Sequence, residues 1–126
     1  MKILLVTLFC YITLAACSGD LQNPEITSAN LELQLAEIKE LAQTDGCSEN
    51  AQCSYLPYGS KPCGGPRGFV IFSSEIDTAA LKSKIEKYTK AEEAYNEKHG
   101  IISDCMLEVP PQNIGCIDGN CKEIQE

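Results

Sequence analysis

The chain has 126 residues, 44% of them hydrophobic, and its 18 acidic against 10 basic residues give a formal net charge of −8. That balance excludes a nucleic-acid-binding protein, whose positive patch should be visible in the composition. It argues against adhesion to anionic lipid headgroups, and it is compatible with a solvated acidic surface or a basic protein partner.

The first 16 residues predict an export signal. Lys2 supplies a positive charge, and residues 3–16 form an uncharged apolar run. Fourteen residues rise only about 21 Å as a helix, which is less than the hydrocarbon core of a bilayer. A polar stretch starts directly afterwards, at residue 18. We therefore expect a cleaved signal rather than a membrane span.

The sequence Leu14-Ala15-Ala16-Cys17 at the end of that run resembles the lipobox of bacterial lipoproteins. The resemblance implies cleavage before Cys17 by the lipoprotein signal peptidase and a diacylglycerol on the cysteine thiol. Two or three acyl chains hold a protein stably on a membrane. We expect a lipid-anchored protein of the bacterial cell envelope that faces the periplasm or the exterior, and Ser18 favours the outer membrane over the inner. The alternative is an ordinary signal peptide with a chance cysteine.

The mature chain divides into an N-terminal segment, residues 17–45, and a cysteine-rich domain, residues 46–126. Residues 18–28 are polar and predict a tether. In residues 29–43 the spacing of one apolar stripe predicts an amphipathic helix, and the stripe consists of Leu31, Leu35, Ile38 and Ala42. Packing on its own domain is favoured over pairing with another helix.

A Gly- and Pro-rich loop, residues 57–68, separates two predicted strands, residues 53–56 and 69–72. Lys61 and Arg67 lie in this loop on either side of Gly64 and Gly65. A glycine-rich backbone with flanking cations can cradle an anion. A bridge at Cys63 would hold the loop rigid, as small inhibitors present a segment to an enzyme. The alternative is a loop stapled only for stability.

A long helix is predicted over residues 77–99, with Asp77 as its N-cap and Gly100 just after its end. Its apolar face consists of Leu81, Ile85, Tyr88, Ala91 and Tyr95. Glu86 and Lys90 form a favourable pair on its outside. Residues 101–109 then predict a strand that is stopped by Pro110-Pro111.

Asp118-Gly119 is the strongest hairpin signal, because a type I′ turn needs positive φ at both central residues. In the resulting register Cys116 faces Cys121 at a distance that a disulfide can span, and we predict this local bridge. The rival is that both cysteines staple the hairpin to Cys53 and Cys105, which would restrict the unfolded chain more.

An even number of cysteines in a short exported domain predicts a disulfide framework. These six cysteines are Cys47, Cys53, Cys63, Cys105, Cys116 and Cys121. The alternative is a zinc site, but the x₅ and x₄ spacings only approach those of zinc ligands. No C-x-x-C redox motif is present, and we expect neither a metal nor a cofactor.

The expected fold is α+β: a small disulfide-stapled antiparallel sheet packed against one long helix, with an N-terminal helical arm. The ordered cysteine pattern over residues 47–121 resembles a cysteine-rich module of uncharacterised bacterial secreted proteins and lipoproteins. That resemblance implies a recurring fold and no mechanism. A catalytic role for His99, the single histidine, has no G-x-S-x-G motif beside it. We expect a non-enzymatic protein- or ligand-binding module. The alternatives are an inhibitor of an exogenous hydrolase, such as a lysozyme or protease, and a small hydrolase.

Overall fold

The computed structural model describes residues 25–43 and 45–124. The predicted signal and Cys17 lie outside these residues. The elements in chain order are α1 (Ser28–Ala42), the 3₁₀ turn η1 (Asn50–Gln52), β1 (Cys53–Tyr58), β2 (Gly68–Ser73), α2 (Thr78–His99), β3 (Ile114–Ile117) and β4 (Asn120–Glu123). This arrangement confirms the α+β prediction. None of the described helices is long and apolar enough to cross a membrane.

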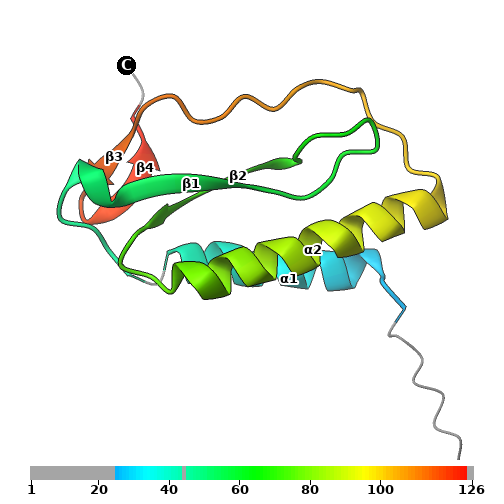
Figure 1. Ribbon diagram of the computed structural model, residues 1–126, viewed down its shortest axis with the longest axis horizontal. Helices are drawn as coiled ribbons and strands as arrows, with labels where there is room; N and C mark the ends of the chain where they lie inside the picture. The colour runs from blue at the N-terminus through cyan, green and yellow to red at the C-terminus, as the bar shows by residue number, and fades with distance from the viewer. Residues whose placement is uncertain (1–24, 44, 125–126) are drawn as a thin grey trace, which may run out of the picture.

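The strands form two antiparallel ribbons rather than one small sheet: β1 pairs with β2, and β3 pairs with β4. Figure 1 shows the β1–β2 ribbon lying over the two helices, with the β3–β4 hairpin at one end of that ribbon. Residues 101–113, which we call the strap, connect α2 to β3. The strap runs along the side of the ribbon that faces away from the helices (Figure 1).

The core lies between the two helices and the inner face of the β1–β2 ribbon. Alternate residues of β2 point into it, and Val70 and Phe72 are buried there. Its buried members are Leu31, Ile38, Ala42, Val70, Phe72, Ile76, Leu81, Ile85 and Tyr88. Since α1 supplies three of these residues, the predicted packing of this helix on its own domain is confirmed.

Both helices begin at side-chain caps. The Thr27 hydroxyl accepts a hydrogen bond from the backbone N–H of Asn30 at 3.2 Å. The carboxylate of Asp77 accepts one from the N–H of Ala80 at 2.9 Å, as predicted. Gly100 follows α2 in the left-handed conformation with φ of 59°, which glycine adopts without a steric penalty.

The terminal hairpin has the predicted turn and register. Asp118 and Gly119 have φ of 51° and 76°, so both central residues are left-handed. Cys116 lies opposite Cys121 in the β3–β4 pairing. The predicted local disulfide between Cys116 and Cys121 is nevertheless wrong, because each of them is bridged to another cysteine.

The bridges are Cys47–Cys116, Cys53–Cys121 and Cys63–Cys105. Facing side chains on a ribbon point the same way, so both hairpin sulfurs project from β3–β4 toward the chain around the start of β1. The alternative prediction was that the hairpin is bridged to Cys53 and Cys105. It is confirmed for Cys53, which pairs with Cys121, and wrong for Cys105, which pairs with Cys63. Such long closures restrict the unfolded chain far more than a six-residue ring would.

The predicted strand at residues 101–109 is also wrong, because no strand forms there. Cys105 has a φ of 56°, which interrupts extended backbone. The carbonyl of Met106 accepts its hydrogen bond from the side chain of Lys61 instead of a neighbouring strand. The β1–β2 ribbon therefore gains no third strand.

Candidate functional site

Three hydrogen bonds hold the backbone of the first two residues of the β1–β2 loop, Gly59 and Ser60, on α2. The Gly59 N–H donates to the Thr89 hydroxyl at 3.0 Å, and the Ser60 N–H donates to Glu92 Oε2 at 2.8 Å. The Asn96 side-chain amide donates to the Ser60 carbonyl at 2.8 Å. The acceptors and donors on α2 recur every three or four residues, so one face of the helix fixes the base of the loop.

Glu92 is the centre of this attachment. It is 4% exposed, and its Oε1 accepts hydrogen bonds from Arg67 Nη1 at 2.6 Å and from the Tyr88 hydroxyl at 3.0 Å. Arg67 also donates to the Tyr88 hydroxyl at 3.1 Å. A buried carboxylate needs such partners, because an unpaired charge in the interior is costly.

The environment fixes the protonation states of these groups. Burial raises the pKa of the Tyr88 hydroxyl to about 12, and the adjacent Glu92 carboxylate adds to the rise. The hydrogen bond from Arg67 to Glu92 raises the pKa of the guanidinium. Tyr88 therefore stays protonated and Arg67 stays charged near neutral pH, so neither is suited to proton transfer.

Gly59 allows the loop to approach Glu92 this closely. Its φ is 78°, and a Cβ placed there would overlap Glu92 Oε2 and lie 2.7 Å from the Cβ of Arg67. A side chain at this position would push apart the same groups that attach the loop to α2.

The attached loop in turn holds the strap. Lys61 Nζ donates to the carbonyl of Met106 at 2.6 Å and pairs with Glu108 Oε1 at 2.7 Å. The Lys61 side chain is only 14% exposed, so this ion pair is shielded on the lysine side. The Cys63–Cys105 disulfide joins the same two segments. Cys105 of the disulfide and Met106, the first contact of Lys61, are adjacent residues of the strap.

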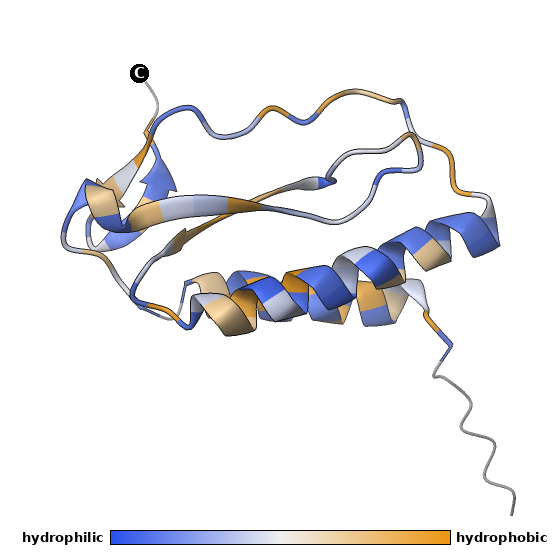
Figure 2. Ribbon diagram, viewed as in Figure 1, coloured by the Kyte–Doolittle hydropathy of each residue, from blue (hydrophilic) through white to orange (hydrophobic). Residues whose placement is uncertain are grey.

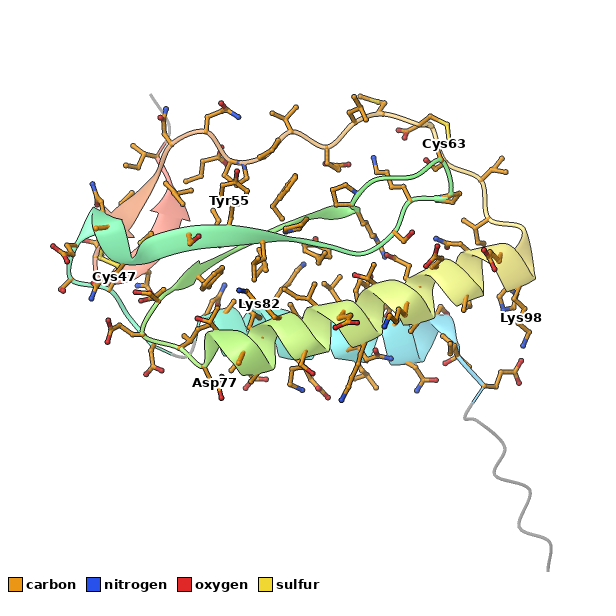
Figure 3. All side chains as sticks on the ribbon, in the orientation of Figure 1. Cys47, Tyr55, Cys63, Asp77, Lys82 and Lys98 are labelled. Atoms are coloured by element: carbon orange, nitrogen blue, oxygen red, sulfur yellow. A yellow bond between two sulfur atoms is a disulfide. The ribbon has the colours of Figure 1, made fainter. Side chains whose placement is uncertain are left out.

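Large apolar side chains project from the strap into solvent. Their exposed fractions are 91% for Ile102, 67% for Met106, 86% for Leu107 and 73% for Val109. Figure 3 shows the side chains along the strap and places Cys63 and Cys47 at opposite ends of the ribbon. Orange segments of the strap in Figure 2 mark its apolar positions. Several large, exposed apolar side chains on one short segment indicate a candidate interaction site.

A cavity of about 690 Å³ lies beneath the strap, between the loop and the two helices. The carboxylates that line it are Glu32, Glu92, Asp104 and Glu108, and they outnumber the cations Lys61 and Arg67. Both cations are already paired with carboxylates. The cavity is therefore acidic and does not favour an anion.

The structure separates the four predicted loop residues. Lys61 and Arg67 point toward the strap and α2, respectively, where their partners lie. Gly64 and Gly65 have positive φ, and a Cβ on either would meet nothing within 4 Å, so both face open space. The geometry thus supports the interpretation of a loop held rigid by Cys63 better than that of an anion cradle.

Two parts of the site were missed in the sequence. Glu92 lies four residues after Tyr88 on the predicted apolar face of α2, and a carboxylate in that position is a signal for a buried partner. The sequence predicts a strand over residues 101–109, but the exposure of residues 106–109 depends on the long-range contact with Lys61. No local pattern encodes that contact.

The remaining chemical candidates are engaged elsewhere. The sulfurs of Cys47, Cys53 and Cys121 lie within 4.8 Å of one another, but all three belong to disulfides and offer no thiolate to a metal. The ring of His99 lies 4.3 Å from that of Tyr95 at the exposed end of α2.

Comparison with protein-family models, with curated proteins and with solved structures finds no match to this chain.

Proposed function

We propose that the protein is a lipid-anchored, extracytoplasmic binding protein without catalytic activity, and that the strap contacts its protein partner. The observation that carries this proposal is the strap itself. Its apolar side chains are exposed to solvent, and its backbone is held by the Cys63–Cys105 disulfide and by the contacts of Lys61. Exposed apolar side chains do not contribute to the stability of the core, whereas a segment that is already ordered lowers the entropic cost of binding.

The disulfides support an extracytoplasmic location. Every cysteine in the described part of the chain is bridged. Disulfides persist in oxidising compartments and are rare in a reduced cytosol. The lipobox-like sequence ending at Cys17 supports anchoring through lipid rather than through a membrane span.

The chemistry of the cavity supports a binding role rather than catalysis. Glu92 is neutralised by Arg67, and Tyr88 holds its proton to about pH 12. His99 lies outside the residues that line this cavity. Ser28, Ser60 and Ser103 also line the cavity, but among the hydrogen bonds of the described residues none joins their hydroxyl groups to a carboxylate or imidazole that could act as a general base.

Pull-down from an envelope extract of the source bacterium tests the proposal. We expect M106D/L107D to lose the partner that the unchanged protein retains. The matched control is L33D on α1, because Leu33 is 64% exposed and lies outside the strap. Equal recovery of the partner with M106D/L107D and with the unchanged protein would remove the strap from the interface.

An inhibitor of an exogenous hydrolase is the second candidate. A rigid, exposed segment fixed by a disulfide specifically favours it, and this segment is the strap rather than the glycine-rich loop.

A further inference from the structure

The backbone of the strap is open to pairing. Among the described residues, the N–H and C=O groups of Leu107, Glu108 and Val109 make no hydrogen bond. A segment with free backbone groups can add to an extended strand of a partner, whose main chain then supplies the hydrogen bonds.

Leu107 is the most exposed apolar side chain of this open stretch, at 86%. It stands between the two groups that Lys61 holds, the Met106 carbonyl and the Glu108 carboxylate. The lysine therefore holds the backbone just before Leu107 and the side chain of the residue just after it, and it leaves the Leu107 side chain and carbonyl free.

Covalent structure limits the strap further. The Cys63–Cys105 bridge lies two residues before Leu107, and Pro110-Pro111 follow three residues after it. Proline fixes φ and so removes backbone freedom. The segment 105–111 is thus restrained at both ends, which lowers the ordering cost on binding.

We propose that residues 106–109 are a substrate-like inhibitory segment for a serine endopeptidase and that Leu107 enters its apolar primary pocket. The inference rests on the proposed function and names its partner. Serine endopeptidases select one side chain just before the scissile bond, and their oxyanion hole receives the carbonyl of that residue. Leu107 presents both groups unpaired. An exopeptidase is excluded as the partner, because the segment continues into the chain on both sides.

The test uses the purified, oxidised protein with chymotrypsin and subtilisin, whose primary pockets accept leucine, and a chromogenic peptide substrate. We expect competitive inhibition of at least one of them. L107D should raise the inhibition constant by about 100-fold or more, as expected for a central anchor residue. L107K should transfer inhibition to trypsin, whose primary pocket contains an aspartate.

The matched control is I102D, because Ile102 is 91% exposed on the same strap but lies before the disulfide. It should change the inhibition constant less than threefold. The proposal is overturned if neither enzyme is inhibited, if L107D inhibits as well as the unchanged protein, or if the strap is cleaved rapidly with no phase of inhibition.

Failure of the inhibitory role can be distinguished from failure of the proposed binding function. If envelope partner recovery still depends on Met106 and Leu107 while both peptidases stay fully active, the binding surface stands and the inhibitory role falls. If neither assay depends on these residues, both proposals fall.

Discussion

At the residue scale, Glu92 joins helix α2 to both ends of the β1–β2 loop. Its carboxylate contacts α2 itself, the backbone of Ser60 and the guanidinium of Arg67. The position of Lys61 one residue after Ser60 means that Glu92 also determines where the strap is clamped. A single buried charge thus positions a surface with which it has no direct contact.

Replacement of Glu92 should destabilise the fold measurably. In E92Q the charge-assisted bond to Arg67 is lost, and we expect a loss of about 1–3 kcal/mol in the free energy of unfolding. The half-exposed guanidinium keeps the loss below that for a fully buried pair. Denaturant unfolding with disulfides intact measures it. The control is E93Q on the exposed side of α2, which should change stability by less than about 0.5 kcal/mol.

The hydroxyl of Tyr88 should ionise at a higher pH than an ordinary tyrosine. Its pKa is raised from 10.0 to about 12 in the folded protein, so the folded state holds this proton more tightly than the unfolded state. The stabilisation is therefore complete below about pH 10 and is lost as the pH rises through about 12. Ultraviolet titration of the phenols should show a late transition that is absent in Y88F and retained in Y55F. A single transition of all phenols with its midpoint near pH 10, complete by about pH 11.5, would contradict this assignment.

At the element scale, local chemistry predicted those elements whose ends are set by their own residues. Asp77 and Gly100 delimit α2, and Asp118-Gly119 set the register of β3 and β4. These signals act within a few residues, so the sequence contains them in readable form.

The strap could not be predicted in this way. Its apolar residues suggest a strand, but strand formation needs a free edge in the right place. The conformation is decided by Lys61 and Cys63, which lie about forty residues earlier. The pairing of cysteines is equally hard to predict from local sequence. The predicted register of the hairpin is correct, but the predicted bridge between Cys116 and Cys121 is wrong.

Removal of the Cys63–Cys105 bridge should loosen the strap before the rest of the fold. We expect C63S/C105S to lose about 2–4 kcal/mol of stability, because the bridge closes a long loop in the unfolded chain. Limited proteolysis should cut residues 101–111 first, with the helices still intact by circular dichroism. A strap that resists cleavage as well as in the unchanged protein would show that Lys61 alone holds it.

At the scale of the whole molecule, α1 contributes to the core and is also the element nearest in sequence to the expected anchor, Cys17. Ile38 is fully buried, and Lys84 of α2 pairs with Glu37 of α1 at 2.6 Å. The helices lie on one side of the β1–β2 ribbon and the strap lies on the other (Figure 1). A chain held through its N-terminal segment would therefore leave the strap on the side away from α1.

The lipid anchor that we propose at Cys17 predicts a specific labelling result. C17A should abolish incorporation of radiolabelled fatty acid and processing by the lipoprotein peptidase, because the acylated thiol is missing. The control is C10A within the expected signal, which should still be labelled. If C17A takes up label and partitions with membranes, the lipobox interpretation is wrong.

The arrangement of the disulfides has a consequence for a nick in the strap. The bridges Cys47–Cys116 and Cys53–Cys121 both span the Leu107–Glu108 peptide bond. Hydrolysis there would add one water to the mass but release no fragment until the protein is reduced. Lys61 holds the Met106 carbonyl before the cut and the Glu108 carboxylate after it. The two new ends would therefore stay at a high effective concentration, so that rejoining them is a reaction within one molecule.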